Sequence, residues 1–243
     1  KGNAIKSESY TTIGTSDAVS LTVSGKGAKG IKTGGDFTLT SGTVKITTTG
    51  AAYYNSTDAD IAAPAGINCD KNLAIKGGDL TIVSSGQGGK GITVDGTATV
   101  NGGTTSITAS GTTYTYTSAN TSEAKGFKCD GAFVMNSGTL NISASDDGLK
   151  SNTSITINDG TVNVTKSYEG MESIFITIAG GVCNLTASND GINTSYGTVS
   201  GGTESNDNSH LKVTGGVLIV TGSDAIDSNG NFTISGGYVI TYG

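Results

Sequence analysis

The chain has 243 residues, contains 39 glycines and 1 proline, and carries charge on only 14% of its residues. Its net charge is −6 at pH 7, and every basic residue is a lysine, which argues against a nucleic acid as partner. Because no run of 18 apolar residues occurs, we expect no membrane span. A hydrophobic content of 34% is low for a globular core but sufficient for the narrow interior of a solenoid.

A unit of about 22 residues recurs along most of the chain. Each unit opens with glycine and a large apolar residue, and from Phe127 to Ile192 the steps are 22, 22 and 21 residues. Elsewhere the steps are 25 and 34 to 36 residues, as expected for the same unit with an inserted loop. A fixed period of this length indicates a solenoid. The openings are Gly30-Ile31, Gly66-Ile67, Gly91-Ile92, Gly126-Phe127, Gly148-Leu149, Gly170-Met171, Gly191-Ile192 and, with glycine replaced, Ala225-Ile226.

Within each unit, apolar residues form three alternating pairs, which is the pattern of short half-buried strands. One unit carries these pairs at positions 127 and 129, 133 and 135, and 140 and 142. The pattern predicts an all-β, right-handed parallel β-helix with three short strands per coil and about 8–9 coils. We expect one domain over residues 1–243, with residues 1–29 as an N-terminal partial coil or cap.

The three cysteines occupy predicted inward positions. Cys69 and Cys129 share a column with Val94 between them, and a separation of two coils, about 10 Å, exceeds the reach of a disulfide. Cys183 falls in another column beside Val162. We therefore expect three buried free thiols that act as small hydrophobic residues.

Three predicted loops interrupt the repeat, near residues 50–64, 111–124 and 195–209. The first two leave from equivalent positions and should emerge on the same side. Long loops on a solenoid usually mark its working face, so their tyrosines could stack on sugar rings. Alternatively, these rings could fold back over the coils. The loop tyrosines are Tyr53, Tyr54, Tyr114, Tyr116 and Tyr196.

Aligning the openings places like charges in register. The residue before the glycine is lysine or alanine in the first coils and acidic from Asp147 onward, so Asp147, Glu169 and Asp190 should stack about 5 Å apart. Asp146, Glu172 and Asp227 add to the same edge. Such a column suits Ca²⁺, which accepts six to eight oxygen ligands without strict geometry. The alternative is that the aspartates only bind turn amides.

The acidic coils also carry a family resemblance. The segments Asp146-Asp147-Gly148-Leu149, Ser167-Tyr168-Glu169-Gly170-Met171-Glu172 and Asn189-Asp190-Gly191-Ile192-Asn193 follow one another at this spacing. Together they resemble the core motif of a bacterial family of polysaccharide-lyase-like carbohydrate-binding β-helices. The segment from Gly222 to Gly230 is similar to that family's next coil, although Ala225 replaces its glycine. The resemblance is strongest over residues 126–243.

The resemblance implies a secreted or cell-surface bacterial protein that binds calcium and adheres to plant cell-wall polysaccharides such as cellulose and polygalacturonate. It assigns calcium ligation to Asp147, Glu169, Glu172, Asp190 and Asn193, with Asp146, Asp224 and Asp227 as further candidates. For sugar contacts we expect the loop tyrosines, Tyr168 and Lys150. A polysaccharide is the expected partner, and no catalytic residue is assigned.

Three other functions remain open. A polysaccharide lyase needs a base, and without arginine Lys150 would have to serve. A hydrolase would use two carboxylates, for which Asp146 or Asp147 with Glu169 are candidates. A structural surface rod or an ice-binding solenoid is suggested by the outward threonines Thr38, Thr40, Thr43 and Thr47, although threonine is also an ordinary strand residue.

Overall fold

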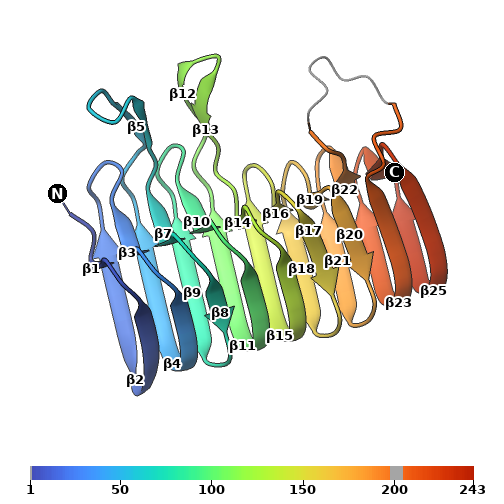
Figure 1. Cartoon of the computed structure of the whole chain (residues 1–243), viewed down its shortest axis with the longest axis horizontal. Coiled ribbons are helices and arrows are strands. Elements are labelled where there is room, and N and C mark those ends of the chain that lie inside the picture. Colours follow the sequence, from blue (N-terminus) through green and yellow to red (C-terminus); the bar gives the residue numbers. More distant parts are fainter. Residues whose placement is uncertain (1, 198–204) are drawn as a thin grey trace.

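A computed structural model describes residues 2–197 and 205–243 of the chain (Figure 1). Over these residues the protein is all-β: two large sheets of parallel strands face each other, and no helix is present. Consequently, no helix in this part of the chain has the length and apolarity to cross a bilayer.

The first sheet has nine strands in sequence order along the molecule. All eight predicted openings lie in register across it, with Ile31 opposite Ile67, Ile67 opposite Ile92, and so on to Ile226. The predicted alignment of the repeats is therefore confirmed. The strands are β1 (Ile5–Ser7), β3 (Lys29–Thr33), β7 (Ala65–Cys69), β10 (Lys90–Val94), β14 (Phe127–Cys129), β16 (Leu149–Ser151), β19 (Met171–Ser173), β22 (Asp190–Thr194) and β24 (Asp224–Ser228).

The second sheet has twelve strands and also pairs each segment with its equivalent in the next repeat. Residues 1–29 contribute the first strand of each sheet: β1 pairs with β3 in the first sheet, and the strand over residues 11–23 pairs with β4 in the second. The strands are β2 (Thr11–Val23), β4 (Phe37–Thr48), β8 (Leu73–Ile75), β9 (Asp79–Ser84), β11 (Ala98–Ala109), β15 (Phe133–Ala144), β17 (Ser154–Ile157), β18 (Thr161–Lys166), β20 (Phe175–Ile178), β21 (Val182–Thr186), β23 (His210–Thr221) and β25 (Asn231–Tyr242).

The prediction of three short strands per repeat holds for some repeats and is wrong for others. Where the repeat contains β7, β8 and β9, or β16, β17 and β18, three strands are separate. In β4, β11, β15, β23 and β25, the second and third predicted strands run together as one strand of 12 residues. The glycine turn between them is only a bulge, as at Gly103 with its φ of 76°, so extended backbone continues through it.

Two of the three predicted loops form hairpins that rise from the same edge of the molecule, as expected (Figure 1). The first pairs β5 (Tyr53–Asn55) with β6 (Asp60–Ala62), and the second pairs β12 (Tyr114–Thr117) with β13 (Asn120–Ser122). The third predicted loop, at 195–209, lies outside the described residues from 198 to 204.

Inward-facing side chains from both sheets form one continuous hydrophobic core. The rings of Phe127 and Phe133, from the two sheets, meet edge to face at 5.2 Å between centroids. The cysteines lie in this core as buried free thiols, with Val94 in register with both Cys69 and Cys129, which confirms the prediction. Cys183 lies opposite Val162, as expected.

The opening glycines are required by close approach between neighbouring repeats. A Cβ at Gly91 would lie 2.4 Å from the carbonyl oxygen of Gly126, and one at Gly126 would lie 2.6 Å from that of Gly148. The same conflict recurs along the column up to Gly191. Ala225, at the equivalent position, lies in β24, which is the edge strand of this sheet among the described residues, so its Cβ meets no carbonyl of a following strand there.

Asparagine side chains connect neighbouring repeats on the outside of the second sheet. The Nδ2 of Asn163 donates to Oδ1 of Asn141 at 2.9 Å, and the Nδ2 of Asn184 donates to Oδ1 of Asn163 at the same distance. A second ladder links Asn158, Asn136 and Asn101. The stacking of successive repeats therefore repeats side-chain hydrogen bonds as well as apolar contacts.

Replacing Gly91 by alanine should destabilise the fold by about 2 kcal/mol or more, because the new methyl group overlaps Ile107 and the Gly126 carbonyl. Urea unfolding would measure the loss. The matched exchange Ala225→Gly at the edge position should cost no more than about 1 kcal/mol. Equal effects of the two substitutions would contradict the account of close approach.

Candidate metal centre and adjoining groove

The residues that precede the opening glycines form a column that is basic or neutral up to Lys125 and acidic from Asp147 onward. Because Phe127 lies opposite Leu149, the residues two positions earlier, Lys125 and Asp147, also lie side by side. Likewise Lys150 lies opposite Glu172. At these two register positions the charge changes sign between neighbouring repeats, so oppositely charged side chains lie side by side.

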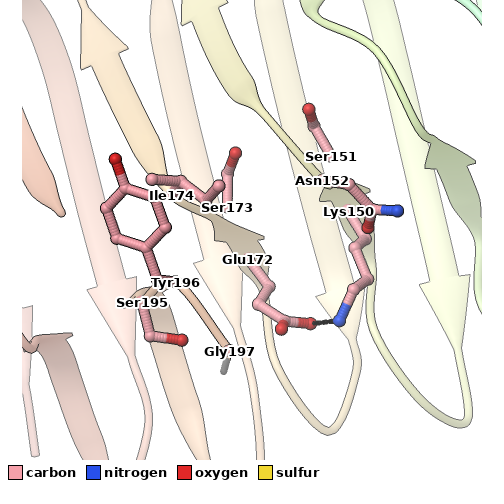
Figure 2. A pocket seen from close by; sticks show the side chains of 9 residues that line it. All are labelled: Lys150, Ser151, Asn152, Glu172, Ser173, Ile174, Ser195, Tyr196 and Gly197. Atoms are coloured by element: carbon pink, nitrogen blue, oxygen red, sulfur yellow. Dashed lines mark hydrogen bonds and ion pairs between the residues drawn. The ribbon is translucent and has the colours of Figure 1, made fainter. Parts of the chain in front are cut away.

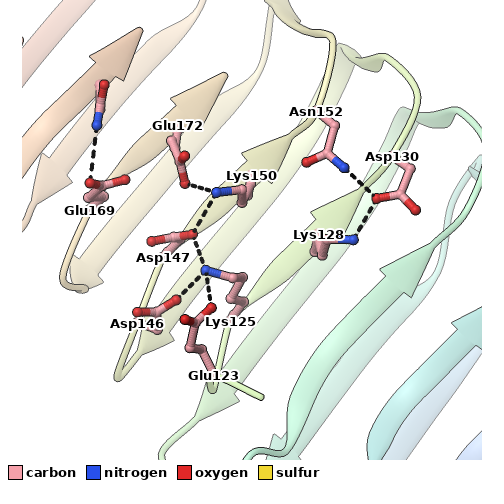
Figure 3. A network of polar contacts seen from close by, with 11 residues as sticks. Glu123, Lys125, Lys128, Asp130, Asp146, Asp147, Lys150, Asn152, Glu169 and Glu172 are labelled. Atoms are coloured by element: carbon pink, nitrogen blue, oxygen red, sulfur yellow. Dashed lines mark hydrogen bonds and ion pairs between the residues drawn. The ribbon is translucent and has the colours of Figure 1, made fainter. Parts of the chain in front are cut away.

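Three of the predicted ligands come together into what we term the acidic cluster: Asp147, Glu169 and Glu172. One carboxylate oxygen from each lies within 4.8 Å of the other two (Figure 3). Asp147 and Glu169 precede the opening glycines of β16 and β19, and Glu172 lies within β19. Two successive repeats thus supply carboxylate oxygens to one point on the surface, an arrangement suited to a hard cation.

Two lysines border the acidic cluster (Figure 3). The Lys125 Nζ lies 2.5 Å from Oδ2 of Asp147 and 3.0 Å from Oε2 of Glu123, and it also pairs with Asp146. Lys150 pairs with Glu172, and its Nζ lies 3.7 Å from Oδ2 of Asp147. Sequence reasoning did not assign Lys125 or Glu123 to the site, although the alignment of the openings places Lys125 next to Asp147.

Burial dominates the electrostatics of the acidic cluster. Asp147 is 3% exposed, and burial raises its pKa to about 7, with Lys125 opposing the shift and Glu172 and Asp146 adding to it. The pKa of Glu169 is also raised, by burial and then by Asp147, against a hydrogen bond at 3.1 Å from the Asn193 Nδ2. Five carboxylates, those of Glu123, Asp146, Asp147, Glu169 and Glu172, therefore surround two ammonium groups.

Four further predicted ligands lie in the next two repeats, on β22 and β24. Asp190 is in register with Asp224, and Asn193 with Asp227. Burial raises the pKa of Asp190 to about 6, with contributions from Asp227 and Asp224. The Asn189 Nδ2 donates to Oδ2 of Asp190 at 2.9 Å. The structure thus divides the predicted ligands into the acidic cluster with Asn193, a separate aspartate group around Asp190, and Asp146, which pairs with Lys125.

An open groove of about 240 Å³ adjoins the acidic cluster (Figure 2). Glu172 belongs to both, Lys150 lines the groove beside it, and Tyr196 forms the opposite side of what we term the tyrosine groove. The lining residues are Lys150, Ser151, Asn152, Glu172, Ser173, Ile174, Ser195, Tyr196 and Gly197. Two of the residues predicted to contact sugar are therefore brought together beside the predicted metal ligands.

The tyrosine of this groove is held in place from two sides. Its ring packs edge to face on Phe175 at 5.9 Å between centroids, and its backbone nitrogen donates to Oδ2 of Asp207 at 2.7 Å. The Tyr196 residue remains 40% exposed, which leaves ring surface open to a ligand. Tyr168, next to Glu169, is 50% exposed.

The hairpin tyrosines lie elsewhere and contact one another. The rings of Tyr54 and Tyr116 stack at 3.8 Å with an interplanar angle of 4°, and the Tyr54 nitrogen donates to the Tyr114 hydroxyl at 3.1 Å. Tyr53 packs against Gly27, where an added Cβ would lie 2.8 Å from its Cε1. The two hairpins therefore brace each other, and their tyrosines do not join the tyrosine groove.

A family model described as carbohydrate-binding domain-containing protein matches residues 2–111 and 86–170 of the chain. The two matches together span more than two thirds of its 243 residues. The chain belongs to this family. The matched region includes Asp146, Asp147 and Glu169, and it covers the first repeats, where the sequence resemblance is weaker. Comparisons with curated proteins and with solved structures found no match.

Without metal, the protein should become less stable as the pH rises from 5.0 to 7.5. Since the folded-state pKa of Asp147 is about 7 against an ordinary 3.8, its stabilising contribution is complete below about pH 4 and is lost through about pH 7. Asp190, with a pKa of about 6, acts in the same direction. Melting temperatures in chelator would measure this, and Asp147→Asn should weaken the dependence. A melting temperature that rises over this range would contradict the assignment.

Proposed function

We propose that this protein is a right-handed parallel β-helix that uses calcium to adhere to plant cell-wall polysaccharide, such as cellulose or polygalacturonate, without cleaving it. We further propose that it acts outside a bacterial cell, as a secreted or surface protein, since its polysaccharide lies there. Right-handedness follows from the general preference of parallel crossover connections. Membership of the carbohydrate-binding domain family supports the sugar partner.

The observation that carries the proposal is that one residue, Glu172, belongs to both the acidic cluster and the tyrosine groove. A calcium ion held by Asp147, Glu169 and Glu172 would lie at the rim of that groove. The three carboxylates supply up to six oxygens, and water or sugar oxygens can complete the shell. Sugar hydroxyls or a uronate carboxylate could thus bind the ion directly.

The groove supplies two further kinds of contact to a sugar. The exposed face of Tyr196 can stack on a sugar ring, as aromatic side chains do on flat apolar surfaces. The Lys150 ammonium, already beside Glu172, can pair with a uronate carboxylate. The groove would therefore contact an acidic sugar through three groups: the Tyr196 ring, the Lys150 ammonium and the bound calcium ion.

Cleavage has weaker support than binding. To act as the base of a lyase, Lys150 would have to leave its ion pair with Glu172. For the hydrolase alternative, both Asp146 and Asp147 are paired with Lys125. Incubation with polygalacturonate should release neither unsaturated uronides, which absorb ultraviolet light, nor new reducing ends; either product would replace the binding function with an enzymatic one.

Calorimetric titration should find at least one bound calcium ion. Glu169→Gln should lower the affinity for that ion at least about tenfold, because one charged ligand is lost. Glu169 is chosen because, within the described residues, no lysine forms an ion pair with it. The control Glu8→Gln alters an exposed carboxylate that pairs only with Lys6 among the described residues. Unchanged affinity and stoichiometry in Glu169→Gln would rule out its ligand role.

Replacing Tyr196 by alanine should weaken binding to polygalacturonate about tenfold, because the stacking surface is removed from the groove. Affinity electrophoresis in calcium would measure the change. Tyr10→Ala is the matched control, since Tyr10 is exposed and belongs to the opposite end of the sheets. Equal retardation of both variants and the wild type would exclude the tyrosine groove as the binding site.

A further inference from the structure

A second groove, of about 320 Å³, lies between the β5–β6 hairpin and strands β3, β7 and β10, with β14 separating β10 from β16 and the acidic cluster. We term it the lysine groove. Lys29 and Lys90 lie in register with Ala65 from either side, so their backbones are separated by two strand spacings, about 10 Å. The small Ala65 side chain between them leaves the space open. The polar and charged residues that line it are Lys29, Asp60, Asn68, Lys90 and Thr93.

These two lysines differ from the others of this sheet in lacking a carboxylate partner. Lys6, Lys32, Lys125, Lys128 and Lys150 each form an ion pair with an aspartate or glutamate. Lys29 and Lys90 form none with any residue that the structure describes. The Lys29 Nζ instead donates to the carbonyl oxygen of Gly27 at 2.9 Å, and the Lys90 Nζ donates to the Ser122 hydroxyl at 2.5 Å.

Both ammonium groups are held where water solvates them poorly. Burial lowers the pKa of Lys29, and burial followed by repulsion from Lys125 lowers that of Lys90 to about 8. Glu123 and Asp146 partly oppose the shift at Lys90, and Asp70 does so at Lys29. An anion in the groove would therefore relieve an existing electrostatic cost.

The floor of the groove offers a further polar group without a partner. The Thr93 hydroxyl oxygen is buried, and no hydrogen bond to it is found within the described part of the chain. Asn68 lies beside it, in register on the neighbouring strand β7. On the hairpin side, the Oδ1 of Asp60 accepts the Ile61 amide at 2.7 Å, and this exposed carboxylate is screened by solvent.

We propose that the lysine groove is a second saccharide subsite, which binds the carboxylate of an acidic sugar directly and without calcium. Lys29 and Lys90 pair with the carboxylate, while Thr93 and Asn68 hydrogen-bond to sugar hydroxyls. The subsite rests on the proposed carbohydrate binding but uses residues separate from the acidic cluster. The molecule then recognises acidic polysaccharide in two ways, through a bound cation at one place and through its own ammonium groups at another.

The test is titration of the full chain with a galacturonate oligosaccharide in excess chelator and at low salt, so that calcium-mediated binding is absent. Wild-type protein should bind, and both Lys90→Gln and Lys29→Gln should bind at least about tenfold more weakly, as expected for the loss of one charge-assisted hydrogen bond. Lys76→Gln is the control, because Lys76 is exposed and lies between β8 and β9 of the other sheet. Melting curves of each variant establish that it is folded.

Three further comparisons distinguish this subsite from the calcium site and from a general anion site. Glu169→Gln should bind the oligosaccharide in chelator as well as the wild type does, even if calcium-dependent adhesion is lost. No binding by the wild type, or equal binding by the two groove variants and Lys76→Gln, would overturn the subsite while leaving the calcium-dependent function intact. Inorganic sulfate or phosphate binding as tightly as the oligosaccharide would overturn its assignment to a sugar, and so would equal binding of a neutral cello-oligosaccharide.

Discussion

Parallel pairing between equivalent segments of successive repeats is the constraint on which the structure depends. Each strand of the two large sheets lies beside its counterpart from a neighbouring repeat, on both sides except at the sheet edges, so its side chains have the equivalent side chains of another repeat as neighbours. Where the repeated residue is apolar, this arrangement builds a continuous core. Where it is asparagine, it builds a ladder of hydrogen bonds. Where it is the opening glycine, it allows backbones to approach too closely for any Cβ.

The same constraint makes repeated charge costly. Two like charges one strand spacing apart repel by about 1 kcal/mol in water and several times more where burial lowers the dielectric constant. The chain reduces this cost at two positions by a change of sign between repeats, which pairs Lys125 with Asp147 and Lys150 with Glu172. It does not remove the negative charge around Glu169, which the calcium ion that we propose would compensate. Around Lys29 and Lys90 the excess charge is positive, because neither lysine has a carboxylate partner among the described residues.

Much of this could be predicted from the sequence, because register follows from the period alone. The alignment of Ile67, Ile92 and Phe127, and the position of the free cysteines, required only counting residues between openings. The pairing of Lys125 with Asp147 was also implicit in that count. The positions of inserted loops could not be predicted, since these loops have no repeat. The stacking of Tyr54 on Tyr116 and the position of Tyr196 across the groove from Glu172 depend on the three-dimensional geometry of hairpins and loops. The merging of strands in β11 and β15 depends on how sharply each glycine turn bends, which composition does not determine.

The most direct test of the proposed calcium site is to locate a bound metal ion in a crystal of the protein soaked with a lanthanide that replaces calcium. An anomalous peak is expected among the carboxylates of Asp147, Glu169 and Glu172, at the rim of the groove that holds Tyr196. A peak only at other residues, or no peak while these three carboxylates remain together, would contradict the calcium-dependent function.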